Sequence, residues 1–137
     1  MSLSFHEKSL WLIFLSLFGI FTFYFGTVLP FKSPNLEPQH VTAFAVALCA
    51  LVLTQIAGHI VIAIMDHRTE TDERDRVIAL KGTRNAAYVL SAGVFLALCT
   101  ALFMDGNLVF THILLAGWVL SQLVEYGSQL VLYRRGA

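Results

Sequence analysis

The chain has 137 residues, of which 57% are apolar and only 13% are charged, and its nine basic and nine acidic side chains cancel. A soluble domain carries about 25% charged residues, so this composition excludes an ordinary water-exposed domain and indicates lipid as the surrounding solvent. The zero net charge provides no basic field for nucleic acid, and no nucleic-acid partner is expected.

The first long apolar run covers about residues 10–29 and is rich in aromatic side chains. Ser4 and Glu7 have the spacing of a capping box, which predicts a helix that begins near Phe5. A membrane-spanning helix needs about 20 apolar residues, and this run is long enough. Because no small-residue cleavage site follows a short apolar core, we expect an uncleaved first span.

Three further apolar runs follow, and none contains a proline. The prolines all lie between residues 30 and 38, where they predict an extended loop, and Asp105-Gly106-Asn107 predicts a tight turn. We therefore expect one all-α integral membrane domain over residues 1–137, a four-helix bundle built from two hairpins. Including the first run, the expected transmembrane helices cover about 10–29, 41–65, 85–104 and 108–133.

Basic residues are distributed unevenly around these spans. Eight of the nine lie near the amino end, in residues 66–84 or at the carboxyl end, whereas Lys32 alone lies in one of the other two connections. Basic residues flank the cytoplasmic ends of transmembrane helices. Both termini and residues 66–84, which we call the connector, are therefore predicted to be cytoplasmic.

The connector holds five of the nine basic and five of the nine acidic residues. Thr69 or Thr71 is expected to cap a helix that continues into the third span. Acid–base pairs four residues apart, such as Glu70 with Arg74, each stabilise a helix by about 0.2–0.5 kcal/mol. The pattern is typical of a solvated helix, and it also fits a docking surface for a cytosolic protein. The candidate partner-binding residues are Asp72, Glu73, Arg74, Asp75 and Arg76.

Two metal or cofactor sites were open alternatives. Asp66, His67 and Glu70 are carboxylates with one imidazole, a set that suits several divalent ions without selecting one. His40 and His112 lie near the outer ends of the second and fourth spans, where a histidine pair could hold haem or a metal. Isolated histidines near an interface are commoner, so we expect no metal and no cofactor. The sequence has no P-loop, H-E-x-x-H or nucleophile motif, which favours a non-enzymatic protein.

Polar residues inside the apolar runs form a second candidate site. Gln55 and His59 lie four apart in the second span, and Gln122, Glu125 and Gln129 share one face of the fourth. A charge at the bilayer centre costs about 2.5–3.5 kcal/mol, so Glu125 is expected either to be neutral or to face a partner such as His59, Gln55 or a water-filled space. Interhelical hydrogen bonding is the simplest role for this polar cluster. A role with a proton, ion or ligand, or a contact with a second copy, is the alternative.

A stripe of small residues, Gly93, Ala97 and Ala101, repeats every four positions in the third span. Small residues at this spacing allow a neighbouring helix backbone to approach closely. We therefore expect this face of the third helix to form a tight helix–helix contact.

Two short motifs give the chain a resemblance. Phe5-x-Glu7-Lys8-Ser9-x-Trp11 at the start, and Asp72-Glu73-Arg74-Asp75 before the third span, resemble a group of small bacterial four-helix membrane proteins of unknown function. The resemblance implies a multi-pass protein of the bacterial inner membrane. It implies no active site, so no functional residue is assigned from it.

The expected function is that of a non-enzymatic interaction or regulatory protein that presents the connector to a cytosolic partner. The alternative is a subunit of an oligomeric transporter or channel, in which Glu125, His59, Gln55 and Gln122 carry the function. A homo-oligomer fits the second hypothesis best, because four helices enclose little space.

Overall fold

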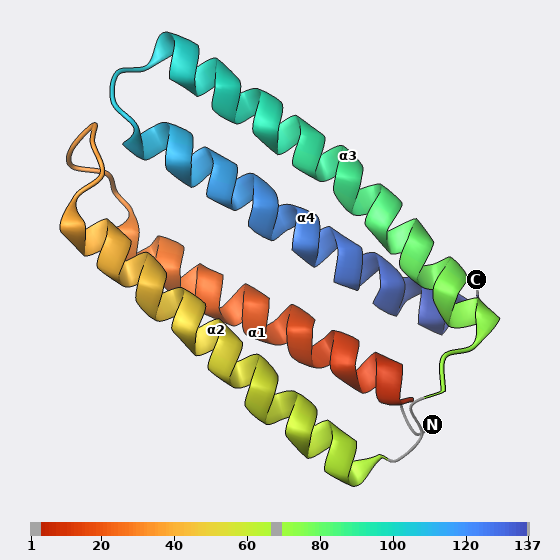
Figure 1. Ribbon diagram of the computed structural model, residues 1–137. Helices are drawn as coiled ribbons and strands as arrows, with labels where there is room; N and C mark the ends of the chain where they lie inside the picture. Colours follow the sequence, from red (N-terminus) through yellow and green to blue (C-terminus); the bar gives the residue numbers. More distant parts are fainter. Residues whose placement is uncertain (1–3, 67–69, 137) are drawn as a thin grey trace.

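A computed structural model shows four long helices that run alternately up and down (Figure 1). It describes residues 4–66 and 70–136. Helix α1 covers Phe5–Val28, α2 covers Pro38–Met65, α3 covers Glu73–Phe103 and α4 covers Leu108–Arg135. No strand occurs among the described residues. All four helices are long and apolar enough to cross a membrane, which confirms the expected all-α fold with four candidate spans.

Helix α1 begins at Phe5, as the sequence predicts. The Ser4 hydroxyl accepts a hydrogen bond from the backbone N–H of Glu7 at 3.2 Å, and the Glu7 carboxylate accepts one from the N–H of Ser4 at 3.0 Å. Two of the amide groups that a helix start leaves unpaired are thereby satisfied.

Helix α3 is capped by Asp72 and not by a threonine. The Asp72 carboxylate accepts from the N–H of Glu73 at 2.6 Å, and the Asp75 carboxylate accepts from the N–H of Asp72 at 3.0 Å. Thr71 lies before the cap, so the prediction that it starts the helix is wrong, and Thr69 lies outside the described residues. A carboxylate at this position also complements the positive end of the helix dipole, an advantage that a threonine hydroxyl lacks.

The second half of the connector is therefore helical and continuous with the third span. Helix α3 has 31 residues, so it is about 46 Å long, whereas the hydrocarbon core of a bilayer is about 30 Å thick. Its first three turns carry the charged residues and extend beyond the apolar stretch that begins at residue 85. Glu70 lies before the start of α3, so it cannot form the expected i,i+4 helical pair with Arg74.

The helices pack in the spatial order α2, α1, α4, α3, with α1 and α4 in the middle. The α3–α4 contact is the closest, because Gly93 faces Gly117 and a Cβ atom on Gly93 would lie 2.7 Å from the Gly117 Cα. Ala97 is completely buried in the same contact, as expected, but Ala101 is exposed. The small-residue stripe instead continues towards the start of α3, through Ala86 and Gly82.

The largest group of buried side chains lies around α1. Leu17, Phe21 and Tyr24 of α1 pack against Leu51 of α2 and Val119 of α4. Large apolar side chains elsewhere point outwards, and Phe103 is 85% exposed. An apolar exterior of this extent is what a lipid-facing surface requires.

The two short connections meet at one end of the bundle, which we call the loop end (residues 29–37 and 104–107). The N–H of Leu36 donates to the Asn107 side-chain oxygen at 2.9 Å, and the N–H of Leu108 donates to the Pro34 carbonyl at 3.0 Å. Gly106 has a φ of 81°, and a Cβ there would lie 2.1 Å from the Pro34 oxygen. We call the opposite end, which holds the starts of α1 and α3 and the ends of α2 and α4, the connector end (Figure 1).

Candidate functional site

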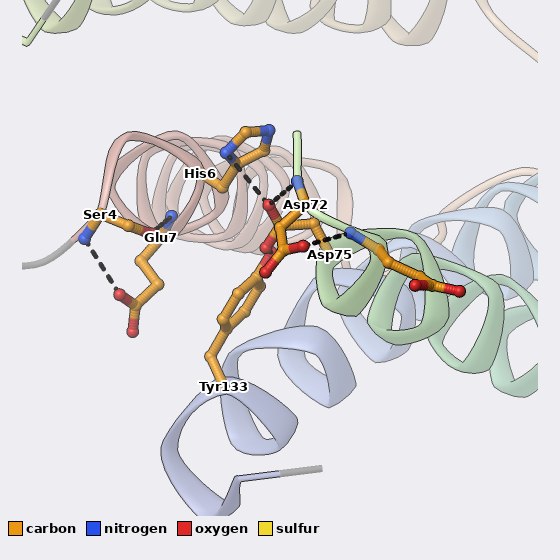
Figure 2. A network of polar contacts seen from close by, with 7 residues as sticks. Ser4, His6, Glu7, Asp72, Asp75 and Tyr133 are labelled. Atoms are coloured by element: carbon orange, nitrogen blue, oxygen red, sulfur yellow. Dashed lines mark hydrogen bonds and ion pairs between the residues drawn. The ribbon is translucent and has the colours of Figure 1, made fainter. Parts of the chain in front are cut away.

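Asp75 lies at the centre of a polar network at the connector end (Figure 2). The Tyr133 hydroxyl of α4 donates to one carboxylate oxygen of Asp75. The other oxygen accepts from the N–H of Asp72 and lies 3.8 Å from Nδ1 of His6 on α1. One carboxylate at the start of α3 therefore contacts both α1 and α4.

Arg74 adds a second link between the start of α3 and the end of α4. Its Nη2 donates to the backbone carbonyl of Tyr133 at 3.1 Å, and its guanidinium carbon lies 5.9 Å from the centre of the Tyr133 ring. Carbonyls in the last turn of a helix lack partners within the helix, so this cation satisfies one of them and complements the negative end of α4. We refer to His6, Asp72, Arg74, Asp75 and Tyr133 as the Asp75 network.

Several groups act on the ionisation of Asp75, which lies outside the apolar part of α3. Burial is the largest influence and raises its pKa, but the hydrogen bonds from Tyr133 and from the Asp72 backbone lower it. The nearby His6 and Arg74 lower it further by electrostatic attraction, and the net pKa of Asp75 lies below its ordinary value. Asp75 is therefore an ionised hydrogen-bond acceptor at neutral pH.

A charged cleft of about 560 Å³ opens beside the Asp75 network. Lys8 of α1 and Asp66 at the end of α2 lie on its wall, and Nζ of Lys8 is 3.2 Å from the Asp66 carboxylate. Glu70 lines the same cleft and is exposed. The ends of α1 and α2 are thus joined by an ion pair beside the contacts that join α1, α3 and α4.

The five connector residues that the sequence nominates for partner binding do not share one environment. Asp72, Glu73, Arg74 and Arg76 are exposed, whereas Asp75 is partly buried and points at Tyr133. The sequence places Tyr133 on the polar face of the fourth span but does not pair it with Asp75, and it gives no role to His6. Both lie far from Asp75 along the chain, and only the fold brings them together.

The intramembrane polar residues fall into two separate groups. In the first, Gln55 Nε2 donates to the Ser16 hydroxyl of α1 at 2.6 Å. His59 Nδ1 donates to the Gln55 carbonyl at 2.8 Å, so its Nε2 accepts from the Ser9 hydroxyl at 2.7 Å. Gln55 Oε1 is buried and has no hydrogen-bond partner among the described residues. These contacts hold α2 against α1.

The second group lies between α4 and α3. Glu125 accepts a hydrogen bond from the Thr83 hydroxyl at 2.9 Å, and Gln129 is buried against Gly82. Gln122 is half-buried, with no side-chain hydrogen bond to the part of the chain that is described. The structure thus places Thr83, and not His59 or Gln55, opposite Glu125.

The separation of these two groups follows from the helix order. Because α1 lies between α2 and α4, Gln55 and His59 meet α1 before they can reach α4. The expected single polar cluster is therefore two smaller ones. The sequence placed these residues on the correct helices but could not say which helix each of them faces.

His112 and His40 lie together at the loop end. His112 Nδ1 donates to the Leu108 carbonyl at 2.9 Å and its Nε2 accepts from the Tyr24 hydroxyl at 2.8 Å, so both ring nitrogens are occupied. The His40 ring centre lies 5.9 Å away, and Tyr24 and Phe31 also pack on His112. Both nitrogens of His112 are engaged within the protein, which leaves it no free ligand atom.

No group of three potential metal-ligating side chains occurs in residues 4–66 and 70–136. The alternative with Asp66, His67 and Glu70 depends on His67, which lies outside the described residues.

Comparisons of this chain with family models, with curated proteins and with solved structures gave no match. The resemblance to small bacterial four-helix membrane proteins therefore stays a prediction.

Proposed function

We propose that this chain is a non-enzymatic, multi-pass protein of the bacterial inner membrane that binds a cytosolic protein through the start of α3. The recognition surface consists of the exposed side chains of Asp72, Glu73 and Arg76, with Arg74 at its edge. The connector end is cytoplasmic in this proposal, in keeping with the basic residues that gather there.

The observation that supports this proposal most strongly is the position of Asp75. It joins the start of α3 to α1 and α4, so the neighbouring exposed charges are held on a fixed helix turn and not on a loose linker. A preorganised surface loses less conformational freedom when it binds, which leaves more of the interaction energy for affinity.

The surface carries both signs of charge at close spacing. Asp72 and Glu73 are acidic, and Arg76 lies less than one helical turn further along. Mixed charges of this kind select a partner with the matching pattern and raise the association rate more than the affinity. A partner with several oppositely placed charges fits this surface better than a lipid headgroup or a single ion does.

Photo-crosslinking in native membranes tests this function. A photoreactive amino acid at Val77, which is 44% exposed, would report the neighbours of the surface. The triple variant Asp72→Asn, Glu73→Ala, Arg76→Ala should lose a discrete cross-linked band, because it removes the charges that make the contact. An asparagine at position 72 can still cap α3. Asp75 and Arg74 stay unchanged, so the link between the helices is preserved.

The matched control is the double variant Lys32→Ala, Asp105→Ala, which removes exposed charges of both signs at the loop end. It should keep the band. A triple variant that is inserted in the membrane and yields an unchanged set of cross-linked proteins would refute the proposal.

One observation favours the alternative, a subunit of an oligomeric transporter or channel. Glu125 is an acid within the apolar part of α4, and its only side-chain hydrogen bond in the described structure is to Thr83. Because the polar residues are divided between two helix pairs, a path for ions would have to form between copies. Proton or cation flux into liposomes that Glu125→Gln abolishes would support it, and no flux with the wild-type protein would exclude it.

A further inference from the structure

A groove at the loop end combines apolar walls with one unsatisfied polar group. It has a volume of about 510 Å³ and lies between α2 and α3, over the sides of α1 and α4. Aromatic rings of Tyr24, Phe44 and Trp118 line it, and Leu90 of α3 forms part of the opposite wall. This volume lies within the range of about 300–1,000 Å³ that small-molecule sites occupy.

The unsatisfied group belongs to His40. Its Nδ1 accepts a hydrogen bond from the N–H of Glu37 at 3.0 Å, so the proton of the neutral ring is carried on Nε2. No hydrogen bond to Nε2 occurs among the described residues, although the His40 side chain is only 7% exposed. His112 differs from His40, because both ring nitrogens of His112 are hydrogen-bonded within the protein.

His40 Nε2 keeps some accessible surface, since Gln55 Oε1 is the one polar side-chain atom of the described residues that is both fully buried and unpaired. An acceptor that reaches this surface would pair with the N–H. His40 borders both the groove and a smaller, more polar cleft of about 270 Å³ beside residues 27–33. A ligand that satisfies this arrangement has an apolar body in the groove and a hydrogen-bond acceptor at the boundary with the cleft. His40 lies in the first turn of α2, which places that acceptor near the membrane surface.

The lining of the groove narrows the class of ligand further. Three aromatic side chains favour a flat ring, which packs on them in offset or edge-to-face arrangements. Lipid-soluble quinones are one class of flat, membrane-soluble ring that carries a carbonyl acceptor. We propose that this groove binds a lipid-soluble quinone, with one ring carbonyl accepting a hydrogen bond from Nε2–H of His40. This inference is independent of the partner-binding function proposed above.

Photoaffinity labelling tests the proposal with an azido derivative of a short-tailed benzoquinone and purified protein in nanodiscs. Labelling should saturate, map to residues 40–44 of α2 or 111–118 of α4, and be displaced by decylubiquinone. An excess of added phosphatidylglycerol should not displace it. Displacement by the phospholipid to the same extent would assign the groove to a lipid and overturn the proposal, as would labelling that does not saturate or that maps elsewhere.

Two variants test separately the hydrogen-bond donor of His40 and the shape of the groove. Asn at position 40 keeps an oxygen near the Nδ1 position for the Glu37 N–H but has no atom at the Nε2 position, so His40→Asn should weaken binding about tenfold or more. Leu90→Trp should fill the groove and abolish labelling. Leu120→Trp, in a different apolar groove on α4, is the matched control and should leave the affinity unchanged.

Helical content by circular dichroism and a single peak in size-exclusion chromatography establish that each variant is folded. Undiminished affinity in a folded His40→Asn protein would refute the role of His40. Undiminished labelling of folded Leu90→Trp would show that the ligand lies outside the groove.

Discussion

The two ends of the bundle are held together by different chemistry. At the connector end, charged side chains such as Asp75, Arg74 and Lys8 join the helices, and their neighbours stay in contact with water. At the loop end the contacts are made by neutral groups. They are the His112–Tyr24 hydrogen bond and the hydrogen bonds that backbone N–H groups donate between the two loops. Charge gathers at one end, whereas the other end keeps a neutral N–H donor, that of His40, beside an apolar groove.

Because of this difference, the two ends suit different partners: a protein at the connector end and a small ligand at the loop end. Exposed charges lose much of their hydration only when a partner covers them, so they suit contact with another protein. A neutral N–H that borders an apolar groove pairs best with a ligand that brings a hydrogen-bond acceptor, so it favours ligands that carry one. The predictions below test whether the two ends are as distinct as the structure indicates, starting with the contact that holds both of them in place.

The largest effect is expected from Gly93→Val in the α3–α4 contact. A Cβ at this position overlaps the Gly117 backbone, which cannot move aside as a flexible side chain would. We expect the free energy of unfolding to fall by about 3 kcal/mol, which is near the maximum usual for overpacking. The contacts at the connector end and at the loop end should both be weakened. Denaturant unfolding in detergent measures the loss. Gly19→Val is the control, because a Cβ at Gly19 meets nothing within 4 Å; equal losses in both variants would show that the contact is not close.

Gly106→Ala should disturb the loop end alone. Its positive φ is unfavourable for alanine, and the added Cβ would overlap the Pro34 carbonyl oxygen. We expect a loss of about 2 kcal/mol, within the range for a non-glycine residue held in this conformation. Hydrogen exchange should become faster at the Leu36 and Leu108 amides and stay unchanged at the Asp72 amide. Faster exchange at all three amides would mean that the ends are coupled.

Tyr133→Phe should weaken the connector end by about 1 kcal/mol, because it removes a hydrogen bond to a carboxylate but keeps the ring under Arg74. Tyr88→Phe is the control, since Tyr88 is 71% exposed. Thermal unfolding in detergent compares the two variants. The quinone affinity proposed for the loop end should stay the same in both, and a fall in Tyr133→Phe would link the two ends.

The smallest effect is a dependence of stability on pH. The pKa of Asp75 is lower in the folded protein than in the unfolded chain, so its contribution is complete above the unfolded value of about 4 and is lost as the pH falls through the folded value. Asp75→Asn removes this contribution. The stability of the variant should therefore fall less steeply than that of the wild type when unfolding is followed below about pH 4. Parallel curves would show that Asp75 is not held as an anion by the network.

Much of the fold follows from patterns that are local in the sequence. Apolar runs long enough to cross a bilayer predict all four helices, and the capping box at Ser4 predicts the start of α1. The start of α3 does not follow from the sequence in the same way, because several residues that can cap a helix lie close together. In the structure, hydrogen bonds at Asp72 and Asp75 show that Asp72 is the cap.

The partners of the polar residues could not be predicted in the same way. Which side chain Glu125 or Asp75 contacts depends on the order of the helices, and apolar runs of similar character do not encode that order. The order α2, α1, α4, α3 sends Gln55 to Ser16 and Glu125 to Thr83, and it divides a cluster that the sequence treats as one. His40 and His112 lie near the same end, as the sequence predicts, but their contact was not predicted. Only their hydrogen bonds distinguish the ring with two partners from the ring with one.

Cysteine labelling from each side of the membrane tests whether the charged end faces the cytoplasm and the loop end faces the opposite side. Glu73→Cys and Asp105→Cys, both at exposed positions, would be made in a chain whose Cys49 and Cys99 are replaced by alanine. We predict that a membrane-impermeant maleimide labels position 105 in intact cells and labels position 73 only after the inner face is opened. Labelling of both positions from the same side, or of position 73 alone in intact cells, would contradict the account.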